Sequence, residues 1–215
     1  MSEECCKGRG RPKSLSDESQ RCVIVDKARR LFLQNGYGAT KTEDIAAACK
    51  ISKQTLYRLF PGKASLFAAV VQANAPQWLE LPVPEDLPLQ QALERIFRID
   101  ITEEEDRERL DFAKLGLAEG RNHPELHDIV RECGSKYSAT ALAGWMARQA
   151  ELGRLRLAGD AYSTARMLMD MIFGALVMKL FGDMEWPSGA ARRAHISTAI
   201  GVFLHGVCGP APHAS

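Results

Sequence analysis

The stretch from Thr42 to Lys63 constrains the fold of this chain most, because it holds two short helical patterns separated by a tight turn. Ser52 stands where it can cap the second helix, after the break at residues 50–51. The apolar positions fall on one side of each pattern: Ile45, Ala46 and Cys49 in the first, and Leu56, Leu59 and Phe60 in the second. This spacing predicts a helix-turn-helix.

The other face of the second helix carries side chains that can hydrogen-bond base edges or phosphates. We expect base or near-base contacts from Lys53, Gln54 and Arg58. We expect phosphate contacts from Thr42, Tyr57 and Lys63, with Ser52 and Thr55 in the same DNA-binding site. The segment therefore predicts an interface with nucleic acid.

Several short segments around this interface occur in a specific order and spacing: Ala28–Phe32, Gly36–Thr40, Asp44–Ala46, Ile51–Lys53, Thr55–Tyr57, Phe60 and Lys63–Leu66. Together they resemble the DNA-binding domain of TetR-family transcriptional regulators, over roughly residues 20–72. The resemblance implies a homodimer in which the helix from Lys63 to Ala75 transmits ligand binding to the DNA-binding helices. Beyond this region only the helical layout is similar, so no ligand-binding residue carries over.

The charge of the chain is divided unevenly. Residues 1–75 hold 13 Lys and Arg against 7 Asp and Glu, a net +6, whereas residues 76–215 hold 15 against 20, a net −5; the two give the overall +1. The basic N-terminal part and the acidic C-terminal part indicate that only the N-terminal part contacts a polyanion.

Helical periodicity recurs along the chain and sustained strand-like alternation is missing, so we expect an all-α protein. The expected parts are a flexible basic arm (1–16), the DNA-binding domain (17–75), a helical ligand-binding and dimerisation domain (76–208) and a tail (209–215). The expected helices begin near Ser16, Thr42, Ser52, Lys63, Leu89, Thr102, Pro124, Asp160 and Ser188. Thr42 is expected to cap the second of them, and Gly134 with Ser135 to soften the long one after Pro124.

The arm carries Arg9 and Arg11 in an Arg-Gly-Arg-Pro sequence that resembles the core of an AT-hook. Such an arm lies in the narrow minor groove of A·T-rich DNA, whose negative potential attracts arginine. The alternative is an unstructured basic tail that contacts phosphates without base preference. We expect the arm to contact DNA, and both explanations of how it does so stay open.

Two helices near the C-terminus carry more apolar surface than one core contact needs, which predicts a four-helix dimer interface with the two-fold mate. The alternative is that they complete the core of a monomer. The resemblance and the gain in specificity from pairing two short DNA-binding helices favour a dimer. The predicted interface residues are Leu168, Ile172, Ala175, Met178, Ile196, Ile200, Phe203 and Val207.

The middle helices combine apolar side chains with a few polar ones, as small-molecule pockets do. Side chains at this spacing also occur in an ordinary core, and that explanation stays open for each of them. The residues proposed for the pocket are Trp78, Phe97, Phe112, Leu115, Glu119, Trp145 and Met171.

Other site classes find little support in the sequence. The acidic run from Glu103 to Asp106 suits the first turn of a helix without a cation, and His123 with His127 lacks a third metal ligand. We therefore expect no metal, no cofactor and no enzymatic activity. The scattered cysteines, the missing secretory segment and the interrupted apolar run from Met167 to Phe181 favour a cytoplasmic protein.

These observations predict a homodimeric repressor that binds a near-palindromic operator and is released by a small-molecule effector. The alternative is an effector-independent architectural DNA-binding protein or an activator, which would use the basic arm on A·T-rich DNA. The operator sequence and the chemistry of the effector do not follow from the sequence.

Overall fold

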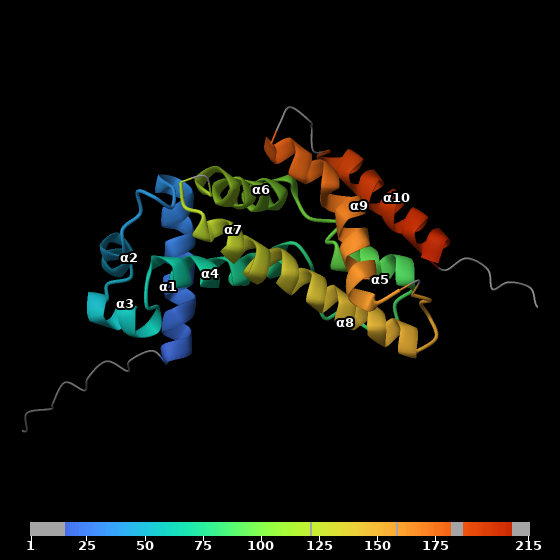
Figure 1. The fold of residues 1–215 in the computed structure, drawn as a ribbon, viewed down its shortest axis with the longest axis horizontal. Coiled ribbons are helices and arrows are strands. Elements are labelled where there is room, and N and C mark those ends of the chain that lie inside the picture. The colour runs from blue at the N-terminus through green and yellow to red at the C-terminus, as the bar shows by residue number, and fades with distance from the viewer. Residues whose placement is uncertain (1–15, 121, 158, 182–186, 208–215) are drawn as a thin grey trace, which may run out of the picture.

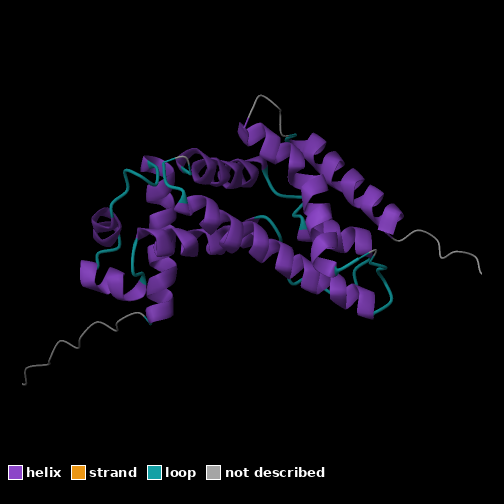
Figure 2. Cartoon of the chain, in the orientation of Figure 1, coloured by secondary structure: helices purple, strands orange, loops and turns teal. Residues whose placement is uncertain are grey.

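A computed structural model describes residues 16–120, 122–157, 159–181 and 187–207 of the chain. For residues 117, 175–181, 206 and 207 it describes the backbone alone. Every regular element in this part of the chain is helical (Figure 2), which confirms the all-α prediction. Arg9 and Arg11 of the predicted arm lie outside the described residues.

The helices follow the predicted order closely (Figure 1). They are α1 (Asp17–Asn35), α2 (Thr42–Ala48), α3 (Lys53–Leu59), α4 (Lys63–Asn74), the 3-10 turn η1 (Ala75–Gln77), α5 (Leu89–Ile96), α6 (Glu103–Glu119), α7 (Glu125–Ile129), the π-helical segment η2 (Val130–Lys136), α8 (Tyr137–Glu151), α9 (Ala161–Phe181) and α10 (Gly189–Val207).

Short polar side chains begin three of these helices as the sequence predicts. Ser16 accepts a hydrogen bond from the backbone N–H of residue 19, Ser52 from that of residue 55, and Thr102 from that of residue 105. The predicted cap at Thr42 was wrong. The N-cap position of α2 belongs to Lys41, whose backbone N–H donates to the Asp44 carboxylate at 3.3 Å.

The long helix expected after Pro124 is divided by the π-helical η2, which contains Gly134 and Ser135, where the sequence predicts a softer middle. Gly134 lies against α4, because an ideal Cβ at this position would be 3.3 Å from a methyl of Val71. A π-helical turn shifts the register of a helix and commonly marks a functional position. Here it places the backbone close to the helix expected to transmit ligand binding.

The apolar residues form two cores. The first joins α1–α4 with parts of α6 and α7: Ile24, Ala28, Phe32, Tyr37, Ile45, Ala46, Leu56, Leu59, Phe60, Leu66, Phe67, Val70, Val71, Phe112 and Leu126. The second lies between α5, α8, α9 and α10, with Leu93, Ile96, Phe97, Leu142, Met146, Leu168, Ile172, Ile196 and Ile200 among its members. The first core thus recruits side chains from beyond residue 75.

The predicted dimer-interface residues need correction. Leu168, Ile172, Ile196 and Ile200 are each 0% exposed and Phe203 is 5% exposed within one protomer, so a partner has no access to them. They face inward because α9 and α10 must first cover α5 and α8. The side chains of Ala175, Met178 and Val207 lie outside the described residues. Among the side chains of α9 and α10 that the structure describes, the large apolar ones that are exposed are Tyr162, Met167, Met171 and Val202.

Candidate nucleic-acid interface

The helix-turn-helix is held from inside by its apolar positions and by the turn between the two helices. Ile45 of α2 and Leu56 of α3 are at most 1% exposed. Lys50 adopts a left-handed backbone with φ 55°, and the Ile51 N–H then donates to the Ala46 carbonyl at 3.0 Å. The orientation of α3 against α2 is therefore fixed by packing and by the turn.

The outer face of α3 presents the residues that the sequence predicts. Lys53, Gln54, Tyr57 and Arg58 are exposed, while Thr55 is half-buried beside Ser52 and bonded to its hydroxyl at 2.9 Å. The Gln54 side chain is exposed, so its amide is available to a base edge. Contact with DNA by these residues stays a prediction.

Two of the candidate DNA-contacting cations, Arg58 and Lys53, are paired with carboxylates of the same chain. Arg58 donates both Nη groups to the Asp17 carboxylate, at 2.6 and 2.8 Å. Lys53 Nζ donates to Glu43 at 2.9 Å. Hydrogen bonds from these cations hold the pKa of Asp17 and of Glu43 below their ordinary values. Asp17 lies 41 positions before Arg58, so sequence spacing gave no signal for it.

Thr42 and Tyr57, the two hydroxyls expected at phosphates, lie together. Their oxygens are 2.9 Å apart, and Thr42 also donates to Glu43 at 3.3 Å. Tyr57 remains 45% exposed. The pair joins α2 to α3 on the outer surface, where a phosphate could accept from either hydroxyl.

Lys63 holds the turn between α1 and α2. Its Nζ donates to the Tyr37 carbonyl at 2.8 Å and the Gly38 carbonyl at 3.2 Å, and it lies 4.4 Å from the centre of the Tyr37 ring. The predicted phosphate contact would have to share these donors. A lysine retains three donors, so the two functions are compatible.

Arg21, which the sequence did not suggest, connects α1 to the end of α3. Its Nη1 donates to the Leu59 carbonyl at 2.6 Å, and its guanidinium lies 4.3 Å above the Phe60 ring. A cation at this position satisfies a carbonyl at the C-terminal end of the short helix. Arg21 is thus a support for the DNA-contacting helix.

The turn after α1 contacts α6 and α7 directly. Tyr37 is 2% exposed and packs against the rings of Phe67 and His123, with ring centroids 5.2 and 5.0 Å away. The Gly38 N–H donates to the Glu119 carboxylate at 3.3 Å. The DNA-binding domain and the larger domain therefore meet at this turn.

Burial, and secondarily the charge of Glu125, raises the pKa of Tyr37 from 10 to about 12. The folded state therefore holds this proton more tightly than the unfolded chain. The resulting stability is complete below pH 10 and disappears as the pH rises through 12. We expect Tyr37→Phe to lack this alkaline loss, on the order of 2–3 kcal/mol in the unfolding free energy. Denaturant titrations of both proteins from neutral to alkaline pH test it, and identical declines would contradict it.

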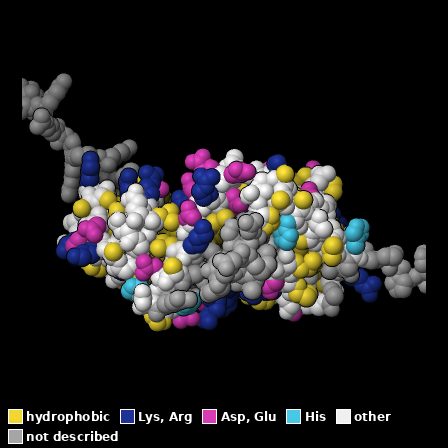
Figure 3. Space-filling view, turned by 90° about the horizontal axis from the view of Figure 1, so that it is seen from above, with side chains coloured by type: hydrophobic (Ala, Val, Ile, Leu, Met, Phe, Trp, Pro, Cys, Tyr) yellow, Lys and Arg dark blue, Asp and Glu magenta, His cyan; other side chains and the backbone are white. Residues whose placement is uncertain are grey.

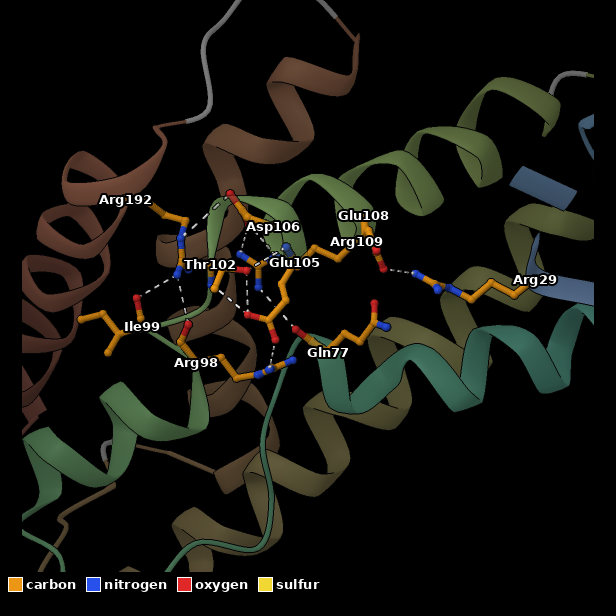
Figure 4. A network of polar contacts seen from close by, with 10 residues as sticks. All are labelled: Arg29, Gln77, Arg98, Ile99, Thr102, Glu105, Asp106, Glu108, Arg109 and Arg192. Carbon is orange, nitrogen blue, oxygen red and sulfur yellow. Dashed lines mark hydrogen bonds and ion pairs between the residues drawn. The ribbon is translucent and has the colours of Figure 1, made fainter. Parts of the chain in front are cut away.

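A buried polar network lies between η1, α6 and α10 (Figure 4). Arg109 is 1% exposed and donates to Asp106 at 2.7 Å and to the Gln77 carbonyl at 3.4 Å. Arg192 is 2% exposed and donates to the carbonyls of residues 98 and 99, with its Nε 3.9 Å from Asp106. Burial lowers the pKa of Arg109 to about 10, partly offset by Asp106.

Helix α6 also contacts the DNA-binding domain, through a side chain on its exposed face. Glu108 of α6 pairs with Arg29 of α1 at 3.2 Å, while Asp106 and Arg109 of the same helix belong to the buried network (Figure 4). A shift of α6 would therefore change both contacts at once.

The residues predicted for a ligand pocket do not surround one cavity. Phe112 and Leu115 belong to the first core, Phe97 and Trp145 pack in or against the second, and Met171 is 40% exposed. Trp78 lies under the Arg109 guanidinium, 4.8 Å away, and Glu119 bonds to Gly38 instead of a ligand. Spacing along helices gave no indication of which core each side chain would join.

An open groove of about 600 Å³ lies beside α5, and none of the predicted pocket residues lines it. Its lining is mostly polar and includes Glu80, Gln91, Glu94, Arg95, Arg98 and Glu105. In the described ranges no three His, Cys, Asp or Glu side chains converge as a metal site requires. None of the described helices has the length and apolarity that a membrane span needs.

The sequence matches two family models in separate parts of the chain. Residues 24–70 match the model of bacterial regulatory proteins of the tetR family, and residues 91–206 match that of the AefR-like transcriptional repressor C-terminal domain. The first model covers α2, α3 and most of α1 and α4, which pack against them. The second covers the chain from α5 to α10. The two matches divide the chain where the charge changes sign.

Two curated relatives and one solved structure show the extent of the similarity. The repressor ComR of Escherichia coli K12 is 42% identical over 71 residues, covering 33% of this chain and only 32% of ComR. The regulator UidR of the same strain is 24% identical over 191 residues, covering 87% of this chain and 92% of UidR. The flavonoid-responsive regulator FrrA has a TM-score of 0.65 at 24% identity, covering 92% of this chain and all of FrrA.

These matches agree with the exposed polar face of α3 and the buried side of the helix-turn-helix described above. The C-terminal model alone spans more than half of the chain. The chain therefore belongs to the TetR family of transcriptional regulators, DNA-binding proteins of the helix-turn-helix type.

Proposed function

We propose that this protein is a homodimeric repressor that binds a near-palindromic operator and releases it when a small-molecule effector binds. The observation that carries the proposal is the exposed polar face of α3, held on a rigid helix-turn-helix. Lys53, Gln54 and Arg58 contact bases or lie near them, and Thr42, Tyr57 and Lys63 contact phosphates. The resulting complex blocks transcription.

Dimerisation lengthens the DNA sequence that the protein can recognise. A seven-residue helix such as α3 reads few base pairs, and a two-fold mate places a second copy about one DNA turn away. Met167 and Met171, which lie one helical turn apart on α9, and Val202 on α10 expose apolar surface outside the protomer core. This surface supports pairing through the outer faces of α9 and α10.

The effector acts through the contacts between the two cores. The α1–α2 turn touches Glu119, α1 touches Glu108, and η1 at the end of α4 touches Arg109, so one shift of α6 reaches all three. The groove beside α5 is open to a polar ligand next to Arg98 and Glu105. FrrA, a protein of similar fold, is named for a response to flavonoids, which supports effector control. The effector must bind the DNA-free state more tightly.

The operator can be obtained by selecting genomic fragments that the purified protein retains, followed by footprinting. We expect a palindromic footprint, and Arg58→Gln should weaken operator binding by about 1–3 kcal/mol while relaxing preference at one position. Arg131→Gln, which removes an exposed arginine of η2, is the matched control and should leave the affinity unchanged. Diffuse protection without symmetry would instead favour an architectural DNA-binding protein.

Effector control is tested separately with the selected operator. A small molecule that binds the protein, shown by calorimetry, should weaken operator binding when it is saturating. Unchanged operator affinity with such a ligand bound would refute the effector-controlled mechanism and leave DNA recognition intact.

A further inference from the structure

Two carboxylates lie on the same exposed surface as the cations expected to contact DNA. Asp17, the first residue of α1, accepts from both Nη groups of Arg58, and Glu43 of α2 accepts from Lys53 Nζ at 2.9 Å. All four side chains are at least 46% exposed. Figure 3 shows basic and acidic side chains next to each other at the end of the molecule that carries α2 and α3. The carboxylates therefore occupy the donors that DNA would need.

These ion pairs contribute little to the stability of the fold. An exposed pair stabilises by at most about 1 kcal/mol, and the helix-turn-helix is already held by Ile45 and Leu56 from inside. The pairing does, however, weaken the binding of any other acceptor to the same N–H donors, because that acceptor must first displace the carboxylate. Arg58 meets Asp17 through two parallel hydrogen bonds, the geometry that arginine also uses for a phosphate or the edge of guanine.

A phosphate and a carboxylate are equivalent acceptors for these cations, but the carboxylate belongs to the same chain and is always nearby. A single phosphate from DNA of unrelated sequence must displace it and then lie beside the released negative charge. Sequence-independent binding consists almost entirely of such phosphate contacts. Asp17 and Glu43 are therefore placed to remove two contacts from it.

We propose that Asp17 and Glu43 restrain sequence-independent DNA binding by holding Arg58 and Lys53 until a fitting operator displaces them. The inference rests on the DNA-binding function proposed above. Generic sites outnumber an operator by many orders of magnitude, so weak generic binding keeps the protein available to its operator. The two acidic residues thus act on specificity without contacting DNA.

The test measures the affinity of the full-length protein for a fluorescent duplex of random sequence, at several KCl concentrations. Each additional phosphate contact multiplies the generic association constant by about eight at about 0.1 M salt and steepens its logarithmic salt slope by about 0.9. We expect Asp17→Asn to bind about five- to tenfold tighter, with a slope steeper by about one. Glu43→Gln should change in the same direction through Lys53.

The chain offers matched controls away from α2 and α3. Asp128→Asn removes the carboxylate of an exposed pair at 2.8 Å between α7 and Arg131 of η2. Glu132→Gln removes that of an exposed Glu–Lys pair at 2.7 Å within η2. Both change the net charge by the same amount, and we expect less than about a twofold change in generic affinity from either. Circular dichroism of each variant checks that the fold is retained.

A double variant distinguishes two causes of tighter binding: the release of Arg58 from its carboxylate, and the change in net charge alone. In Arg58→Gln protein, Asp17→Asn has no arginine to release, so the salt slope should stay unchanged. The inference is overturned if the slope steepens in that background too, or if Asp17→Asn and Asp128→Asn change the affinity equally. A wild-type protein that binds neither the random duplex nor any selected operator, at any salt concentration, would refute the proposed function itself, and the inference with it.

Discussion

Replacing Asp106 with asparagine is expected to lower the unfolding free energy by about 3–5 kcal/mol. The Asp106 carboxylate lies 2.7 Å from Nε of Arg109 and 3.9 Å from Nε of Arg192, and both arginines are at most 2% exposed. Asparagine removes the negative charge and leaves two buried cations facing each other. Denaturant unfolding followed by tryptophan fluorescence measures the loss, since Trp78 lies under Arg109.

Asp111→Asn is the matched control on the same helix. Asp111 pairs with Lys114 at 3.5 Å, and both side chains are about half exposed, so the change should stay within about 0.5 kcal/mol. Equal losses for the two variants would show that the buried network is not held by the Asp106 charge.

Replacing Phe67 with alanine should lower the unfolding free energy by about 3–5 kcal/mol. Phe67 of α4 is 0% exposed, and its ring lies 5.4 Å from Phe32, 5.2 Å from Tyr37 and 5.8 Å from Phe112, measured between centroids. The substitution leaves a cavity where α1, α4 and α6 meet, and it removes three aromatic pairs. Because this cavity lies behind the helix-turn-helix, binding to generic DNA should weaken at temperatures where the variant starts to unfold.

Two further variants show whether the loss comes from the cavity at Phe67. Phe67→Leu leaves a smaller cavity and should cost less than alanine, whereas Val23→Ala alters an α1 side chain that is 44% exposed and should change stability by no more than about 0.5 kcal/mol. A loss below about 1 kcal/mol for Phe67→Ala would mean that the surrounding rings collapse into the space.

The helix-turn-helix could be recognised from the sequence because its determinants are local. The break at residues 50–51, the cap at Ser52 and the stripes around Ile45 and Leu56 all lie within a few positions of the residues they affect. The cap at Thr42 was misplaced by one position, since Lys41 and Asp44 satisfy the same backbone geometry. Periodicity also located the later helices, including the weak middle of the long one at Gly134.

Which core each apolar side chain joins was decided only by the tertiary structure. Leu168 and Ile196 read equally well as interface or core, because periodicity gives the face of a helix and not the element that covers it. Phe112 joined the DNA-binding domain for the same reason. The sequence by itself determined the helices, their ends and the polar face of α3. The pairing of Arg58 with Asp17 and the burial of Arg109 beside Arg192 depend on residues distant in the chain, which only packing brings together.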